Sequence, residues 1–236
     1  MEKIKKIIKI IIELILIVII IFSLVMIIRW CISSINNRKI SKKVNNEIKI
    51  DEILDGKREL DFNYLYNINS DTVGYLTIDE LGINYPVVKT TNNDFYLNHS
   101  FDKSKNIGGW IFMDYRNSSS IEEDRNTVIY GHNMKDGSMF GKLKGLKNSD
   151  IDTIYYYEKK HKTTFKIISI YEIEEESYYI TTHLNDDEYL DFLNTIKNRS
   201  IKEFNYNPSI EDKILTLSTC SNNGKRFVVH AAVLLD

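Results

Sequence analysis

The chain has 236 residues, of which 43% are apolar and 27% charged, a composition that suits one folded domain with appendages and excludes a disordered chain. Its formal net charge of −2 supplies no overall basic field for binding nucleic acid. The two cysteines lie far apart, Cys31 beside an apolar N-terminal run and Cys220 near the C-terminus. We therefore expect no disulfide and one cysteine available for chemistry.

The N-terminal region has the pattern of a membrane anchor. A basic tail, residues 1–9, precedes an apolar run from Ile10 to Ile28 that only Glu13 and Ser23 interrupt. At a rise of 1.5 Å per residue this run forms roughly 28 Å of helix, about the thickness of the bilayer's hydrocarbon core. A cleaved signal peptide would have a shorter apolar core and a small-residue cleavage site. Residues 10–28 are therefore predicted to be a transmembrane signal anchor.

The orientation of this anchor does not follow from charge. Lysines precede the run, and arginines and lysines follow it, so the positive-inside rule gives no decision. Residues 29–68 are predicted to form a stalk and an N-terminal helical segment. Their part from Asn36 to about Leu60 is polar, and Asp61 is suited to cap a short helix over 62–67.

From Val73 onward the sequence changes to short β-rich segments separated by Asn, Asp, Ser and Gly. The predicted strands are 73–78, 83–88, 110–113, 127–130, 164–171, 213–219 and 227–235. Seven or eight strands without regular intervening helices predict a mainly β fold, either a barrel or a sandwich. One amphipathic helix is expected to interrupt it, because Asn185 to Glu188 resembles a capping box and apolar residues follow at helical spacing.

Two apolar strands near the C-terminus carry Cys220 and Arg226, one on each side of a loop that contains Asn-Asn-Gly, a hairpin signal. Residues opposite each other in a hairpin have Cβ atoms about 4.5–5.5 Å apart, so thiol and guanidinium can share one site. A cationic group beside a strand-end cysteine favours chemistry in which negative charge develops. A lone cysteine, however, is more often a small buried hydrophobe.

A histidine raises the case for catalysis. His132 follows a predicted strand and the flexible Gly131, and a Cys–His pair is the minimal machinery of nucleophilic acyl transfer. His230 stands at strand spacing from Arg226 and is a competitor for the role of base. The remaining histidines, His99, His161 and His183, lie in predicted polar loops and are expected to be solvated.

No cofactor and no metal is expected. The spacings of Cys, His and carboxylate residues do not match a zinc site. The acidic cluster of Glu172, Glu174, Glu175 and Glu176 could bind a cation, but a solvated acidic loop is the favoured interpretation.

Several segments together resemble the sortase family, and class B sortases in particular. The signature segments are Thr-Leu-Ser-Thr-Cys at 216–220 with Arg226 downstream, and Tyr-Gly-His-Asn at 130–133. Further similar segments are 69–75, 84–88, 96–98, 109–117 and the helix near 186–199. Each is short, but their number and order are specific. The loop from Cys220 to Arg226 is short, yet Arg226 is its only arginine.

This resemblance implies an eight-stranded sortase barrel over 69–236, preceded by a cytoplasmic tail, a signal anchor and a stalk, with the catalytic domain on the outer face of a Gram-positive membrane. It implies a cysteine transpeptidase that cleaves a C-terminal sorting motif of secreted proteins through a thioacyl intermediate. The acceptor would be an amine of a peptidoglycan precursor. Cys220 would be the nucleophile, His132 the acid and base, and Arg226 the oxyanion partner. Positions that match the class B substrate groove are Asn93, Leu97, Tyr130, Tyr179, Ile180 and Ser218.

Three other interpretations remain open at this point. The Cys-x5-Arg spacing of Cys220 and Arg226 is that of a tyrosine-phosphatase phosphate loop, which needs a helix after the arginine, where a strand is predicted here. A papain-like hydrolase would carry its cysteine on an N-terminal helix before the histidine. A surface-anchored binding or scaffolding barrel would have a buried, inert Cys220.

Overall fold

The computed structural model describes residues 1–47, 50–52, 58–60, 62–159, 161–174, 176–220 and 224–233. The predicted cap at Asp61 and most of the Asn-Asn-Gly turn lie outside these ranges. The side chains of 47, 50–52, 58–60 and Cys220 are not described, so Cys220 is placed by its backbone alone.

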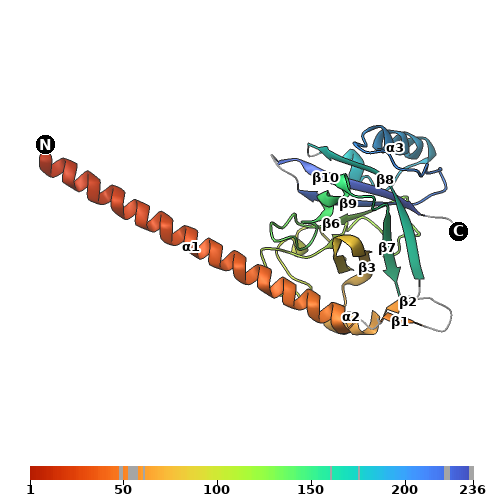
Figure 1. Cartoon of the computed structure of the whole chain (residues 1–236), viewed down its shortest axis with the longest axis horizontal. Helices are drawn as coiled ribbons and strands as arrows, with labels where there is room; N and C mark the ends of the chain where they lie inside the picture. The colour runs from red at the N-terminus through yellow and green to blue at the C-terminus, as the bar shows by residue number, and fades with distance from the viewer. Residues whose placement is uncertain are drawn as a thin grey trace.

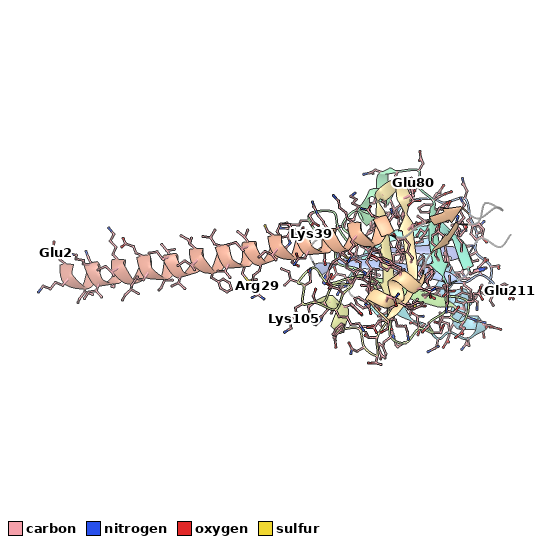
Figure 2. All side chains as sticks on the ribbon, turned by 90° about the horizontal axis from the view of Figure 1, so that it is seen from below. Glu2, Arg29, Lys39, Glu80, Lys105 and Glu211 are labelled. Atoms are coloured by element: carbon pink, nitrogen blue, oxygen red, sulfur yellow. The ribbon has the colours of Figure 1, made fainter. Side chains whose placement is uncertain are left out.

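The N-terminal anchor is the first part of one long helix, α1, Glu2–Glu47, which runs away from the barrel with the N-terminus at its far end (Figure 1). Among the described residues it is the one helix long and apolar enough to cross a membrane. Its apolar side chains between Glu2 and Arg29 project into open space (Figure 2), and the helix meets the barrel domain from about Arg29 and Ser33 onward.

The segment predicted as a stalk with an N-terminal helical part is helical as far as Glu47, because α1 continues into it. The polar α1 residues Ser33, Ser34 and Asn37 are buried against loops of the barrel domain. A short hairpin follows, of β1, Ile50–Glu52, and β2, Arg58–Leu60, and then α2, Phe62–Ile68, which agrees with the helix expected over 62–67.

The rest of the chain forms a closed barrel in the strand order β10-β8-β7-β3-β4-β5-β6-β9. The strands are β3 Thr72–Ile78, β4 Ile83–Val88, β5 Phe112–Met113, β6 Asn126–Tyr130, β7 Thr153–Glu158, β8 His161–Ile173, β9 Ile214–Cys220 and β10 Arg226–Val233. The β4–β5 and β6–β9 pairs are parallel, and the other pairs are antiparallel. Closure pairs each of these eight strands on both sides.

The expected mainly β architecture is confirmed, with local differences. Strand β7 was not among the predicted segments, and β8 extends beyond 164–171 at both ends. The predicted strand at 110–113 pairs only at Phe112 and Met113, although Trp110 and Ile111 are buried too. The turn after β3 is a short 3-10 helix, η1, Asp79–Leu81, closed by Gly82 in the left-handed region at φ 61°.

Two apolar clusters hold the fold together. The larger fills the barrel with aromatic and aliphatic side chains, among them Trp110, Phe140, Tyr156 and Phe227. The smaller lies under α3, Asp186–Asn198, where Tyr189, Phe192 and Ile196 pack on Ile168 and Val228. The predicted capping box begins α3: the Asn185 side chain accepts from the Glu188 N–H, and the Glu188 carboxylate accepts from the Asn185 N–H.

Candidate active site

Three neighbouring strands bring the predicted catalytic residues to one edge of the barrel. Tyr130 on β6 is the register partner of Ser218 on the parallel strand β9, and Cys220 on β9 is the partner of Arg226 on β10. His132 follows Tyr130 by two residues, as Cys220 follows Ser218. Adjacent strands lie about 4.8 Å apart. The backbones of His132, Cys220 and Arg226 therefore end next to one another.

The backbone around His132 is fixed on both sides. The Gly131 N–H donates to the Ser218 carbonyl at 3.2 Å, which extends the β6–β9 ladder by one residue. The Phe140 N–H donates to the His132 carbonyl at 3.0 Å. A Cβ at Gly131 would come within 2.7 Å of the Phe140 ring. Glycine is therefore needed here because the Phe140 ring packs directly against the backbone, and not because of the backbone φ angle.

The imidazole of His132 is half-buried, and its Nε2 lies 2.8 Å from the Leu97 carbonyl oxygen. Because that oxygen can only accept, Nε2 carries a proton and donates, which leaves Nδ1 as the nitrogen free to exchange a proton. Gly109 packs against the same ring: a Cβ there would lie 2.9 Å from His132 Cδ2 and 2.5 Å from the Tyr96 carbonyl oxygen.

A groove of about 260 Å³ opens beside His132 and Arg226. All six residues expected to contact substrate line it: Asn93, Leu97, Tyr130, Tyr179, Ile180 and Ser218. That they touch substrate stays a prediction. The sequence interpretation missed five other lining residues: Asp94, Phe112, Gly131, Glu176 and Thr219. Gly131 and Thr219 are chain neighbours of His132 and Cys220, so adjacency to the predicted catalytic positions is the signal that could have identified those two.

One side of the groove is organised around the buried carboxylate of Asp114. Arg116 binds it in a fork, with Nε 2.9 Å from Oδ1 and a terminal nitrogen 2.7 Å from Oδ2. The Tyr130 hydroxyl donates to it at 2.7 Å and the Asn93 amide at 3.1 Å. Burial by itself would raise the pKa of Asp114, but the hydrogen bonds from Arg116 and Tyr130 outweigh it and hold that pKa below its usual range.

The same network affects Tyr130 in the opposite direction. Burial, and after it the charge of Asp114, raises the pKa of Tyr130 above its usual range. Tyr130 therefore stays a neutral hydroxyl that donates to Asp114, and it is not available as a base. The Asn93 side chain is held as firmly, because its Oδ1 accepts from the Tyr115 N–H at 3.0 Å.

The opposite side of the groove is the segment that carries Tyr179 and Ile180. The Tyr179 hydroxyl lies 3.3 Å from the Ser218 hydroxyl, and the Ile180 carbonyl accepts from Arg116 at 2.9 Å. The Asn126 amide donates to the Tyr179 carbonyl at 3.1 Å. Arg116 thus joins the two sides of the groove.

His230, the competing candidate for the base, is fully buried and does not line the groove. Its Nε2 lies 2.7 Å from the Tyr171 hydroxyl, and its Nδ1 lies 2.8 Å from the Thr216 hydroxyl. Burial lowers the pKa of His230 to about 3, so it remains neutral near pH 7. Sealed beneath the side chains of α3 and already bonded at both nitrogens, His230 has a structural role.

The other histidines also lie away from the groove lining. The expectation of a polar loop is wrong for His161, which begins β8 but is exposed. His99 is half-buried rather than solvated, and its ring stacks on that of Phe95 with centroids 4.0 Å apart.

The acidic cluster forms ion pairs with lysine and arginine rather than a ligand shell, with Glu175 outside the described residues. Within the described part of the chain, no group of three His, Cys, Asp or Glu side chains is placed to hold a metal ion. The ion pairs are Glu172 with Lys144 and Lys147, Glu174 with Lys225, and Glu176 with Arg199.

The strand geometry bears on two of the alternatives. Directly after Arg226 the chain continues as strand β10, where a phosphatase loop requires a helix N-terminus to receive the phosphate. Cys220 ends a strand rather than beginning a helix, unlike the cysteine of a papain-like hydrolase. His132 and Arg226 line the groove, and the backbone of Cys220 lies opposite that of Arg226. A cysteine, an imidazole and a guanidinium in this arrangement suit acyl transfer.

Comparison with known proteins agrees with this chemistry. A family model, "Sortase domain", matches residues 76–234. The chain is 38% identical to sortase B of Listeria monocytogenes over 182 residues, which is 75% of this chain and 70% of the relative.

Solved structures give the same result. Sortase B of Bacillus anthracis, in complex with AAEK1, superposes with a TM-score of 0.76 at 34% identity, and the match covers 87% of this chain and 99% of that one. Sortase B of Staphylococcus aureus superposes with a TM-score of 0.74 at 31% identity, over 85% of this chain and 98% of that one.

Proposed function

This chain belongs to the sortase family, and within it to the sortase B group of cysteine transpeptidases; we propose that Cys220, His132 and Arg226 carry its reaction at the outer face of a cell membrane. The observation that supports this assignment most strongly is the register of β6, β9 and β10, which brings the three backbones to one edge beside the groove. Membership of an enzyme family leaves the non-enzymatic binding barrel without support.

In the proposed first half-reaction, the Cys220 thiolate attacks the carbonyl carbon of the threonine in a sorting motif. The carbonyl oxygen becomes an oxyanion, which Arg226 stabilises. As the tetrahedral intermediate collapses, the C–N bond breaks and His132 gives its proton to the departing amine. The substrate's N-terminal part remains on Cys220 as a thioester.

In the second half-reaction an amine of a peptidoglycan precursor attacks the thioester carbonyl. His132 takes the proton of that amine, a new amide bond forms, and the Cys220 thiolate leaves. The hydrogen bond from His132 Nε2 to Leu97 supports this role, because it leaves Nδ1 to accept and return the proton in both halves.

We assign the sorting motif to the groove between Asn93 and Tyr130 on one side and Tyr179 and Ile180 on the other, which Leu97 and Ser218 also line. An extended peptide in such a groove meets both polar amides and apolar surface. The side chains bound to Asp114 are held in place before substrate arrives, which reduces the ordering cost of binding.

For localisation we propose a tail at 1–9 in the cytoplasm, a span at 10–28 and the barrel of 69–236 outside. Arg29 and Trp30 directly follow the span, and a tryptophan there suits the membrane interface. The segment 29–68 then connects span and barrel as a docked helix with a hairpin and α2, rather than as a polar stalk.

The test of this function is transpeptidation by the full-length protein in detergent or nanodiscs. A pentapeptide library is offered together with triglycine as the acceptor amine, and the products are identified by mass spectrometry. The proposal predicts cleavage after threonine of a preferred motif and a new amide bond to triglycine, both lost in Cys220→Ala and His132→Ala. Cleavage that persists unchanged in Cys220→Ala would contradict it.

A further inference from the structure

The part of α1 beyond the apolar run binds the two loops that hold His132. Residues Ser33 to Arg38 form roughly a turn and a half of helix, and Ser33, Ser34 and Asn37 within them are buried polar residues. Buried polar groups need partners, because an unsatisfied one costs about 1–3 kcal/mol. Here the partners are in the loop before Gly109 and in the loop after His132.

Asn37 makes the closest connection. Its side chain is almost fully buried, and its Nδ2 donates to the Gly109 carbonyl at 3.1 Å. Its Oδ1 accepts from the Ser100 hydroxyl at 2.7 Å and from the Asn106 amide at 2.8 Å. Because the Gly109 carbonyl can only accept, the nitrogen of Asn37 must face it, so the orientation of this amide is determined.

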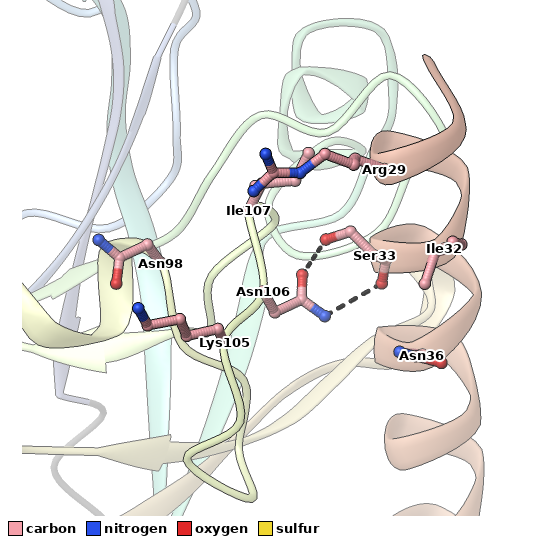
Figure 3. Close-up of a pocket in the computed structure, with 8 residues that line it drawn as sticks. All are labelled: Arg29, Ile32, Ser33, Asn36, Asn98, Lys105, Asn106 and Ile107. Atoms are coloured by element: carbon pink, nitrogen blue, oxygen red, sulfur yellow. Dashed lines mark hydrogen bonds between the residues drawn. The ribbon is translucent and has the colours of Figure 1, made fainter. Parts of the chain in front are cut away.

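Ser33 adds a second attachment to the same loop. Its hydroxyl donates to the Asn106 Oδ1, and the Asn106 amide donates back to the Ser33 carbonyl at 3.1 Å (Figure 3). The Gly108 N–H also donates to the Ser33 hydroxyl, at 3.1 Å. These bonds form one wall of a cavity of about 390 Å³ between α1 and the loop.

The loop held in this way is in contact with His132. Gly109 has φ 55°, in the left-handed region. Its Cα packs against the His132 ring, so that a Cβ at this position would lie 2.9 Å from His132 Cδ2. The next residue, Trp110, donates its N–H to the Tyr96 carbonyl at 2.9 Å. Tyr96 precedes Leu97, the residue whose carbonyl accepts from His132 Nε2. A shift of Gly109 therefore displaces both the ring and its hydrogen-bond acceptor.

A second path reaches the other side of His132. Asp136, four residues after His132, accepts from the Ser34 hydroxyl and forms an ion pair with Arg38, whose Nε lies 3.3 Å from Oδ2. Arg38 also donates to the Asp136 carbonyl at 3.1 Å. α1 is thus attached to the chain on both sides of the imidazole.

We propose that the helical segment from Ser33 to Arg38 positions His132 for proton transfer, with Asn37 as its main positioning residue. The inference rests on the proposed role of His132 as the acid and base. It means that the membrane-proximal part of the anchor supports catalysis as well as localisation. Asn37 lies nine residues beyond Ile28, so its contact with Gly109 is roughly 13 Å along the helix from the end of the apolar run.

The test compares two asparagines of the same helix in the full-length protein. Asn37→Ala removes the amide that holds Gly109. Asn45→Ala is the control: the exposed Asn45 makes two bonds to the barrel against the three of Asn37, accepting from the Tyr75 hydroxyl at 2.7 Å and donating to the Asn84 carbonyl at 3.3 Å, away from His132. Val44→Ala, which removes a buried apolar contact of α1, controls for general loosening of the helix.

We expect Asn37→Ala to lower kcat for a sorting peptide by about tenfold or more with KM within about twofold, because misplacing a catalytic group by about 1 Å can cost a hundredfold. Asn45→Ala and Val44→Ala should change kcat by less than about twofold. Asn37→Asp should fail as Asn37→Ala does, since it keeps the acceptor for Ser100 but places an oxygen against the Gly109 carbonyl.

A second readout does not depend on activity. The ring resonances of His132 are recorded by NMR at one fixed pH, with those of the buried His230 as the internal reference. Because Gly109 packs against the His132 ring, Asn37→Ala should shift or broaden the His132 ring resonances and leave those of His230 unchanged. Equal losses of kcat in Asn37→Ala and Val44→Ala, or unchanged His132 ring resonances in Asn37→Ala, would overturn the proposal. Full activity of His132→Ala would instead remove the proposed function itself.

Discussion

Cys220 and Arg226 are register partners across β9 and β10, and this pair lies beside the end of β6, where the chain reaches His132. The loop that joins them is short, and the Cα atom of Arg226 lies directly opposite that of Cys220 in the ladder. In an antiparallel ladder such partners are about 4.5–5.5 Å apart. That proximity is the basis for assigning Arg226 to the developing oxyanion.

The first prediction concerns the charge of Arg226. Arg226→Ala should lower kcat/KM for a sorting peptide by about a hundredfold or more, the usual cost of losing one oxyanion partner. Arg226→Lys should recover part of this loss, because it keeps the charge but not the planar fork. Steady-state kinetics with circular dichroism as the folding control measure both variants. Activity within twofold of wild type in Arg226→Ala would rule the assignment out.

The second prediction uses two glycines in the left-handed region. Gly109→Ala should reduce kcat strongly, because its Cβ would clash with the Tyr96 and Leu97 carbonyls and with the His132 ring. Gly82→Ala is the control, since Gly82 has φ 61° but its Cβ would meet only the Lys142 Nζ at 3.4 Å. Gly82→Ala should therefore cost about 1–2 kcal/mol of stability from strain alone and leave kcat unchanged. Equal effects on kcat would contradict the close packing of Gly109 on His132.

The third prediction concerns Asp114. Asp114→Asn should raise KM for the peptide more than it lowers kcat, since a neutral amide with one accepting oxygen cannot accept from Arg116, Tyr130 and Asn93 together. It should also cost about 1.5–3 kcal/mol of unfolding free energy at pH 7, because hydrogen bonds to a charged acceptor are lost while the exposed Arg116 remains hydrated. Denaturant titration and Michaelis kinetics measure the two effects.

The pH dependence of this stabilisation follows from the direction of the shift. The pKa of Asp114 is lower in the folded protein than its usual value near 3.9, so the carboxylate stabilises the fold above that value. The stability difference between wild type and Asp114→Asn should be constant above about pH 5 and shrink as the pH falls through the folded pKa. A difference that grows with acidification would contradict the network.

The fourth prediction concerns His230, whose pKa of about 3 lies below its unfolded value near 6.5. Above about pH 6.5 its protonation affects neither state. Below it the unfolded chain binds a proton that the folded protein excludes, so unfolding free energy should fall by about 1.4 kcal/mol per pH unit. In His230→Gln this contribution should be absent, even if the variant is less stable at pH 7. Identical slopes for the two proteins between about pH 6.5 and 4.5 would show that His230 is not a buried neutral imidazole.

Local patterns were sufficient to predict much of the barrel. Strands such as β4, Ile83–Val88, are apolar runs between turn residues, and the Asn185–Glu188 capping box identifies the start of α3. Strand β7, Thr153–Glu158, was missed. Its tyrosines occupy both buried and half-buried positions. Because tyrosine is both apolar and polar, the sequence shows little difference in hydrophobicity between the two faces of the strand.

The form of the segment after the anchor could not be predicted, because its partners are polar. Ser33, Ser34 and Asn37 give the sequence the appearance of a solvated stalk, yet each is buried against groups far away in the chain, such as Asn106 and Asp136. A hydrophobicity pattern detects apolar burial and does not detect a buried hydrogen-bond network. For the same reason, the hydrophobicity pattern could not show that Gly109 packs against the His132 ring.

For the site, the two signature segments predict Cys220, His132 and Arg226, and the structure brings their backbones to neighbouring strand ends; their catalytic roles stay a prediction. The choice between His132 and His230 could not be made from spacing. It depends on the cover that α3 places over His230, which is a contact between distant parts of the chain.

The most direct test of the central claim is the intact mass of the full-length protein after brief incubation with a sorting peptide that it cleaves, followed by quenching in acid. Wild type should gain the mass of the peptide fragment that ends in threonine, as an adduct that hydroxylamine removes. The exposed Cys31 provides the control: Cys31→Ala should form the same adduct, and Cys220→Ala should form none. An adduct that persists in Cys220→Ala, or one that disappears in Cys31→Ala, would contradict Cys220 as the nucleophile.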